Sequence, residues 1–133
     1  MKKANPWWSE NFTAVTLNYK ERDICKKIVE RMHLRFIIAL TGLRRIGKTT
    51  LMMKILDQEI VKGFDKYKIF YFSFDEFFEI RIMELLDIYE EVFQKIQRDK
   101  KYLIVLDEIQ KIKNWSEQLK VIYDLYPNIK FLI

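Results

Sequence analysis

The residues from Gly42 to Thr49 fit the spacing G-x-x-x-x-G-K-[ST], which combines two glycines with a lysine and a hydroxyl side chain. Glycines at these positions let the backbone turn so that successive N–H groups point at phosphate oxygens. Lys48 would then reach the β- and γ-phosphates of a nucleotide as a point charge. The hydroxyl of Thr49 would complete the shell of a Mg²⁺ ion beside the phosphates. The segment therefore predicts a phosphate-binding loop, or P-loop.

The flanks of this loop are those that a P-loop requires. The apolar run Phe36–Leu40 indicates a buried strand before the loop, and a helical pattern begins at Lys48. The chain has 3 glycines, and two of them occupy the motif positions, which argues against an accidental strand-to-helix turn. The predicted nucleotide contacts are Gly42, Leu43, Arg44, Arg45, Ile46, Gly47, Lys48, Thr49 and Thr50.

Two arginines, Arg44 and Arg45, lie inside the loop. Residues at such positions contribute chiefly backbone amides, and their side chains usually point away from the phosphates. We expect these side chains to face a neighbouring subunit or an acidic partner. A direct catalytic role is the weaker hypothesis, because an arginine finger normally reaches the γ-phosphate from another element or protomer.

A second chemical centre follows the apolar run Tyr102–Leu106, which ends in the adjacent carboxylates Asp107 and Glu108. Such a run is typical of a buried parallel strand, and ligands of open α/β sheets lie beyond the carboxyl ends of the strands. We expect Asp107 to hold Mg²⁺ through a water molecule. We expect Glu108 to act as general base on the attacking water or to orient it.

Another pair of acids, Asp75 and Glu76, follows the aromatic run Lys68–Phe74. Solvated loop carboxylates are the commoner case at such a place. These two residues are therefore the next candidates for the base if Glu108 does not serve.

The hydrophobic patterns predict an α/β fold with three layers, α/β/α, around a mostly parallel sheet. In chain order the expected elements are a helix over Lys20–Met32, a strand over Arg35–Thr41, a helix from Lys48 to Gly63, a strand over Lys68–Phe74, a helix over Ile80–Arg98, a strand over Tyr102–Asp107, a helix from a capping box of Asn114 and Glu117 to Tyr126, and a strand over Asn128–Ile133.

The chain begins with an extended arm, Asn5-Pro6-Trp7-Trp8. Large rings bury much area when they dock, so we expect this arm to clamp the surface of the domain. A ligand site made by the two rings is the alternative.

Composition limits the remaining classes. A chain of 133 residues with 50% hydrophobic residues can build one core, and its net charge of +5 is spread among acids. A solvated surface is favoured, with nucleic-acid binding as a weak alternative. The lone Cys25 excludes an internal disulfide framework and a multi-cysteine zinc site, and the single His33 leaves no histidine cluster for a metal or a classical triad. The sequence has no signal segment and no run that would span a bilayer, so we expect a cytoplasmic protein without a membrane partner.

These motifs together resemble those of the archaeal-type P-loop ATPases of the AAA-like superfamily, which are similar to the STAND group of signalling ATPases. The resemblance is carried by Asn5-Pro6-Trp7-Trp8, by Gly42 to Thr50, and by Leu-Asp-Glu-Ile-Gln-Lys over Leu106–Lys111 with Trp115. It implies the cofactors ATP and Mg²⁺ and the P-loop NTPase fold with strand order 5-1-4-3-2. In that order Asn128–Ile133 would lie between the P-loop strand and the strand that ends at Asp107.

The resemblance also implies parts that this sequence does not contain. The family has a polar sensor, a fifth strand, an arginine finger and often a further C-terminal segment. We therefore expect residues 1–133 to be one incomplete ATPase domain, with an arm and helix over 1–34 and a nucleotide-binding core over 35–133. Self-association or a protein partner would act through the missing region, and the 133 residues alone would hydrolyse ATP poorly.

Three rival functions share the P-loop. A GTPase needs a D-x-x-G switch, whereas Asp107-Glu108-Ile109-Gln110 has no glycine, so adenine is favoured. A small-molecule kinase does not need Glu108 beside the metal-binding acid, which favours hydrolysis of ATP. The alternative that stays open is a nucleotide-gated interaction or signalling switch with slow or no turnover.

Overall fold

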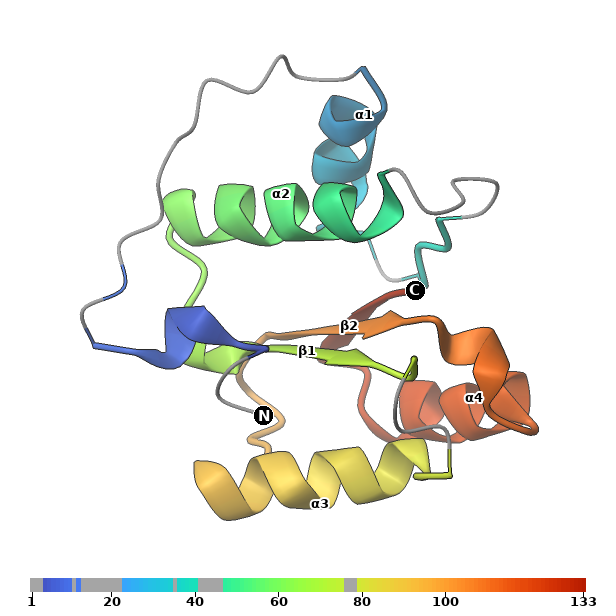
Figure 1. Cartoon of the computed structure of the whole chain (residues 1–133). Coiled ribbons are helices and arrows are strands. Elements are labelled where there is room, and N and C mark those ends of the chain that lie inside the picture. Colours follow the sequence, from blue (N-terminus) through green and yellow to red (C-terminus); the bar gives the residue numbers. More distant parts are fainter. Residues whose placement is uncertain (1–3, 11, 13–22, 35, 41–46, 76–78) are drawn as a thin grey trace.

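A three-stranded parallel sheet forms the centre of the computed structural model, which describes residues 4–10, 12, 23–34, 36–40, 47–75 and 79–133. Its strands are β1 (Ile69–Ser73), β2 (Tyr102–Asp107) and β3 (Ile129–Leu132), adjacent in that order. Helices α1 (Asp23–Arg31) and α2 (Lys48–Val61) lie on one side of the sheet, and α3 (Ile82–Val92) and α4 (Trp115–Leu125) lie on the other (Figure 1). The predicted three-layer α/β/α fold is confirmed.

The segment that precedes the P-loop continues the sheet beyond β3. Ile38 forms a parallel bridge with Leu132, and its N–H donates to the carbonyl of Phe131 at 3.1 Å. The N–H of Leu40 donates to the carbonyl of Ile133 at 2.7 Å. This pairing places β3 between the P-loop strand and β2, as the resemblance implied. Of the predicted strand Arg35–Thr41, the two end residues lie outside the described part of the chain.

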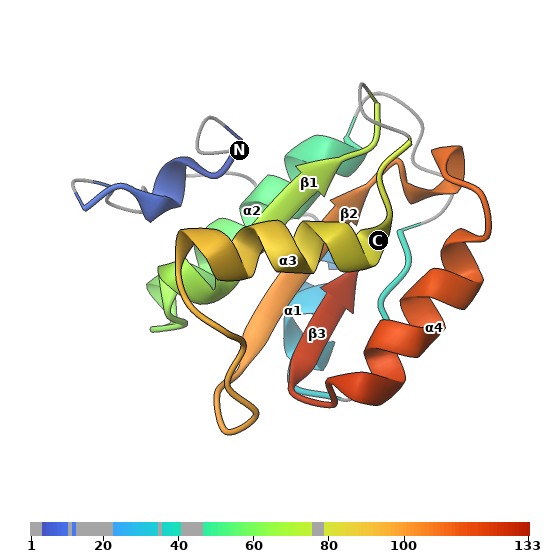
Figure 2. The same cartoon turned by 90° about the horizontal axis from the view of Figure 1, so that it is seen from below.

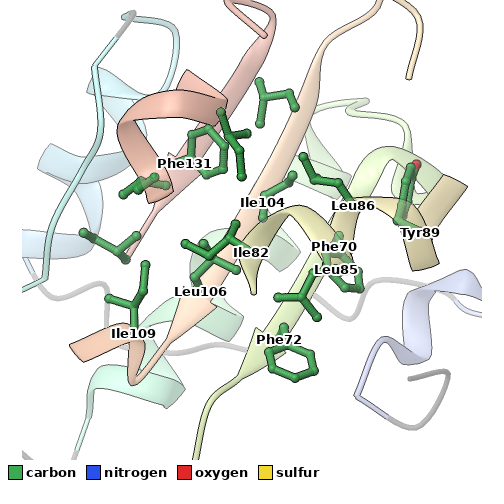
Figure 3. Close-up of a cluster of buried hydrophobic side chains, with 14 of the residues drawn as sticks. Phe70, Phe72, Ile82, Leu85, Leu86, Tyr89, Ile104, Leu106, Ile109 and Phe131 are labelled. Carbon is green, nitrogen blue, oxygen red and sulfur yellow. The ribbon is translucent and has the colours of Figure 1, made fainter. Parts of the chain in front are cut away.

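Alternate residues of each strand face opposite layers, as the pleat of a strand requires. Phe70, Phe72, Ile104 and Leu106 pack with α3 and α4 in one buried cluster (Figure 3). Ile69, Tyr71, Leu103 and Val105 pack with α2 in a second cluster. The aromatic run of β1 is thus covered on both faces, as predicted.

Helix α2 ends as its sequence predicts. Gly63 has φ +103, a left-handed conformation that glycine adopts without a steric cost. The N–H of Phe64 donates back to the carbonyl of Glu59 at 2.9 Å, which closes the last turn.

Helix α3 is shorter than predicted, because it ends at Val92 and not near Arg98. The apolar pattern continues to Ile96, which is buried, but the backbone there has other partners. The N–H of Ile96 donates to Glu90 Oε2, and the carbonyl of Gln97 accepts from the side chain of Asn128. These contacts turn the chain back toward the start of β2, so tertiary hydrogen bonds replaced helical ones.

Helix α4 begins where it was predicted, but the predicted capping box is wrong. Asn114 has a left-handed backbone with φ 56, and its side chain makes no capping hydrogen bond. Gln118 joins the starts of two helices instead. Its Oε1 accepts from the N–H of Ile82 at 3.0 Å, and its Nε2 donates to the carbonyl of Lys113 at 2.9 Å. The left-handed backbone of Asn114 is not the extended conformation that a capping residue needs, so the local motif does not form.

The N-terminal arm lies beside β1, at the edge opposite β3 (Figure 2). Its residues Pro6–Trp8 form a short 3₁₀ turn, and Trp7 is 2% exposed. Trp8 stacks on Phe70, with ring centroids 5.8 Å apart. The prediction that the arm clamps the domain is confirmed.

No helix within the described ranges is both long and apolar enough to cross a membrane.

Candidate nucleotide-binding site

The candidate site lies where β2 ends and α2 begins. Asp107 is the last residue of β2, and it shares the α2 side of that strand with Leu103 and Val105 by the alternation of the pleat. Its side chain is almost completely buried, with 2% of the residue exposed. A carboxylate in such a place has to find partners, since an isolated buried charge is costly.

The first turn of α2 supplies two of these partners. The Thr49 hydroxyl donates to Asp107 Oδ2 at 2.7 Å, across 58 residues of sequence. The Lys48 ammonium lies 4.0 Å from the other oxygen, Asp107 Oδ1. The fold thus brings together the lysine and hydroxyl of the P-loop motif and the strand-end acid, which the sequence analysis assigned to one site.

The third partner of Asp107 is Tyr71, which belongs to none of the sequence motifs. Its buried phenol donates to Asp107 Oδ2 at 2.8 Å, beside the hydroxyl of Thr49. Burial raises the pKa of Tyr71 above its ordinary value of 10.0, and donation to the Asp107 carboxylate raises it further. A signal for this role was present in the sequence. Strand alternation places Tyr71 on the α2 side, but the surrounding aromatic run made it look like core.

The residues around Asp107 fit a Mg²⁺ ion that is shared with phosphates. Asp107 Oδ1 is buried without a hydrogen-bond partner among the described residues, so it can accept from a water molecule on the cation. The Thr49 hydroxyl gives its proton to Asp107 and keeps its oxygen lone pairs for a hard cation. The described residues contain no group of three His, Cys, Asp or Glu side chains that could hold a metal alone. Phosphate oxygens would have to complete this shell.

Glu108, the predicted base, directly follows β2 and is partly exposed. It is one of two non-glycine residues with positive φ in the described chain, at φ 57 and ψ 36. Such a conformation costs about 1–3 kcal/mol and is typical of functional sites. Its Oε2 accepts a hydrogen bond from Gln110 Nε2.

The other predicted residues have different positions. Asp75 is exposed and forms an ion pair with Lys111, and Glu76 lies outside the described residues. The loop positions Gly42, Leu43, Arg44, Arg45 and Ile46 also lie outside them. Gly47 is buried at the start of α2, and Thr50 is exposed on the same first turn.

A parallel α/β sheet with a lysine and a threonine at a helix N-terminus beside a strand-end aspartate defines a P-loop nucleotide-binding protein. A model of the family described as "AAA domain" matches residues 34–133, so the chain belongs to the AAA domain family. Membership in this family indicates nucleotide binding and an ATPase-like function.

A curated relative is similar to most of the chain. The sequence is 38% identical over 90 residues to "Uncharacterized protein MJ1637" of Methanocaldococcus jannaschii. The aligned region covers 66% of this chain and 19% of the relative. The chain therefore spans about a fifth of the length of that protein. No solved structure matches the sequence.

Proposed function

We propose that this domain binds ATP with Mg²⁺ and hydrolyses it to ADP and phosphate. The observation that carries the proposal is the contact of Thr49 with Asp107 at 2.7 Å, with Lys48 beside the same carboxylate. This arrangement supports the proposal because it brings together residues that are far apart in the sequence and that would hold the phosphates and the metal.

Each residue has a separate role in this proposal. Lys48 holds the β- and γ-phosphates, while Thr49 and Asp107 hold the metal directly and through water. The bound ion would neutralise charge on the phosphates during transfer. Glu108 takes the proton of the attacking water as general base.

Substitution of Lys48 by alanine tests the phosphate site. We expect Lys48→Ala to weaken binding of a fluorescent ATP analogue to the full-length protein by at least about a hundredfold, because a charge-assisted contact to two phosphates is lost. Lys120→Ala, which removes an exposed lysine of α4, is the matched control and should bind normally. Unchanged affinity in a folded Lys48→Ala variant would remove the P-loop assignment.

Substitution of Glu108 by glutamine tests hydrolysis. Glu108→Gln should keep Mg·ATP bound while turnover falls at least about a hundredfold, within the range for a lost general base. Near-normal turnover would assign the base elsewhere, with Asp75 and Glu76 next in line.

A second function, a nucleotide-gated switch, is favoured by the hydrogen bond between Gln110 and Glu108. The Gln110 amide occupies one oxygen of the Glu108 carboxylate, which would hinder this group as a base, so ATP would stabilise a conformation with slow or no turnover. Assembly state and phosphate release, measured together with ATP and with a non-hydrolysable analogue, separate the two functions. A change of assembly that occurs equally with both nucleotides, without steady turnover, would favour the switch.

A further inference from the structure

In the ranges that the structure describes, a side chain and not another strand pairs with the outer edge of β1. Asn5 Oδ1 accepts from the N–H of Tyr71 at 2.7 Å, and Asn5 Nδ2 donates to the carbonyl of the same residue at 3.1 Å. Asn5 is 1% exposed, so this pair of bonds is shielded from water. The carboxamide thus mimics one residue of a neighbouring strand and fixes the backbone of Tyr71 from outside the sheet.

Two tryptophans hold Asn5 at this edge. The indole N–H groups of Trp7 and Trp8 both donate to the carbonyl of Ile69, at 3.0 and 2.8 Å. Trp7 packs into the cluster on the α2 side, while Trp8 contacts both clusters, so the rings straddle β1. The arm of residues 5–8 therefore contacts β1 on both faces and along its edge.

Tyr71 contacts both the arm and Asp107. The backbone of Tyr71 bonds to Asn5, and its phenol donates to Asp107 Oδ2 at 2.8 Å. The Tyr71 side chain thus links the buried hydrogen bonds of Asn5 at its backbone to the carboxylate of the candidate metal site at its phenol. Thr49, the other hydroxyl on Oδ2, belongs to the P-loop helix itself.

We propose that Tyr71 is a positioning residue for Asp107 and that the N-terminal arm, through Asn5, sets how tightly the nucleotide site takes up Mg²⁺. This inference rests on the proposed function, because it assigns a metal-binding role to Asp107.

The physical reason is the freedom of a carboxylate about its last side-chain bond, which has broad and roughly two-fold preferences. Two hydroxyls that donate to Oδ2 fix this rotation and leave Oδ1 beside Lys48, where no described residue forms a hydrogen bond with it. When the Thr49 oxygen is engaged by a cation, Tyr71 is the donor on Oδ2 that stays outside the phosphate site. Removal of the phenol oxygen would let the carboxylate rotate and weaken its hold on metal-bound water.

The test compares two tyrosines in the full-length protein. Tyr71→Phe removes the donor to Asp107 and keeps the ring, while Tyr89→Phe removes an equally buried phenol that donates to the carbonyl of Tyr67. Affinity for a fluorescent ATP analogue is measured with Mg²⁺ and with a chelator. Tyr71→Phe should reduce the gain in affinity that Mg²⁺ gives by about tenfold, since a hydrogen bond to a charged group is lost. Tyr89→Phe should leave that gain unchanged, and neither variant should alter binding in the chelator.

The arm is tested with asparagine variants and a double mutant. Asn5→Ala should lower the same Mg²⁺-dependent gain, whereas Asn128→Ala, which removes donors to the carbonyls of Gln97 and Lys100, should not. Asn5→Ser, a neutral and smaller polar side chain that cannot make both bonds to Tyr71, serves if Asn5→Ala does not fold. Because the arm acts through Tyr71, adding either Asn5 substitution to Tyr71→Phe should lower the gain no further.

The outcomes separate this inference from the proposed function. Wild-type protein without Mg²⁺-dependent nucleotide binding would overturn the proposed function and this inference together. Normal wild-type binding that Tyr71→Phe leaves unchanged, or that Tyr89→Phe lowers equally, would overturn the inference alone. Additive losses in the double mutant would overturn the role of the arm and leave the role of Tyr71.

Discussion

The two faces of the sheet differ in chemistry, although the same strands supply both. The face toward α3 and α4 is filled with apolar and aromatic side chains, among them Phe70, Phe131, Leu86 and Tyr89 (Figure 3). The face toward α2 has an apolar cluster too, but at its carboxyl end it buries the charged Asp107 with Tyr71. Successive residues of β2 point to opposite faces, so the two environments are one position apart along the strand.

This difference shows how the domain divides stability from function. Apolar burial is favourable without any particular partner, so the α3 and α4 face can be packed for stability alone. A buried carboxylate is favourable only with its donors in place, and one oxygen of Asp107 has no hydrogen-bond partner in the described part of the chain. The α2 face therefore gives up stability at the point where a ligand would bind.

Leucine-to-alanine substitutions on the two faces should separate these roles most clearly. Leu86→Ala and Leu51→Ala each empty a fully buried site and should lower the free energy of unfolding by about 2–5 kcal/mol. Only Leu51, in the first turns of α2, should also change nucleotide affinity. Denaturant unfolding and binding at a temperature where both variants are folded provide the measurements. An equal loss of nucleotide affinity in Leu86→Ala would contradict the division between the faces.

Neutralising the buried acid should have a smaller effect, confined to the site. Asp107→Asn keeps an oxygen that can accept from Tyr71 and Thr49 but removes the charge, so the Mg²⁺-dependent gain in nucleotide affinity should fall by about tenfold or more. The nucleotide-free protein should lose less stability than Leu86→Ala, because no cavity forms. Asp124→Asn, at an exposed position of α4, is the control. A variant that unfolds would show that the carboxylate is needed for the fold.

The smallest expected effect is in the titration of two buried tyrosines, one on each face. Burial raises the pKa of both Tyr71 and Tyr89 above 10.0. The next cause is Asp107 for Tyr71 and Tyr102 for Tyr89. Asp107→Asn should therefore lower the pKa of Tyr71 and leave that of Tyr89 unchanged. Phenolate absorbance measured against pH, with Tyr71→Phe and Tyr89→Phe to assign each residue, tests this.

The raised pKa values of Tyr71 and Tyr89 also determine how the stability of the fold depends on pH. Below pH 10 the folded and unfolded chains both keep these phenols protonated, so the stabilisation is fully present there. Above it the unfolded chain loses protons that the fold retains, and stability falls as the pH rises. Stability that increases between pH 10 and 11 would contradict the burial of both phenols.

Local patterns were sufficient for most of the elements and for the two motifs. The stop of α2 at Gly63 and the strand that ends at Asp107 follow from residue types alone. The end of α3 and the start of α4 did not follow from them. Asn128 and Tyr102 form hydrogen bonds with Gln97 that replace the helical pattern there, and the left-handed backbone of Asn114 prevents the capping box.

By itself the sequence determined which residues make up the candidate site, because Lys48, Thr49 and Asp107 occupy positions that motif and strand pattern define locally. Only the tertiary structure decided that Tyr71 joins them and that Asn5 holds Tyr71 from the edge of β1. The sequence of an aromatic run does not reveal whether a tyrosine hydroxyl will lie in the apolar core or donate to a carboxylate. The register of β1 on β2 decides the partner of this phenol. Ser73 pairs with Asp107, and Tyr71 lies two residues before Ser73, on the same face of the sheet.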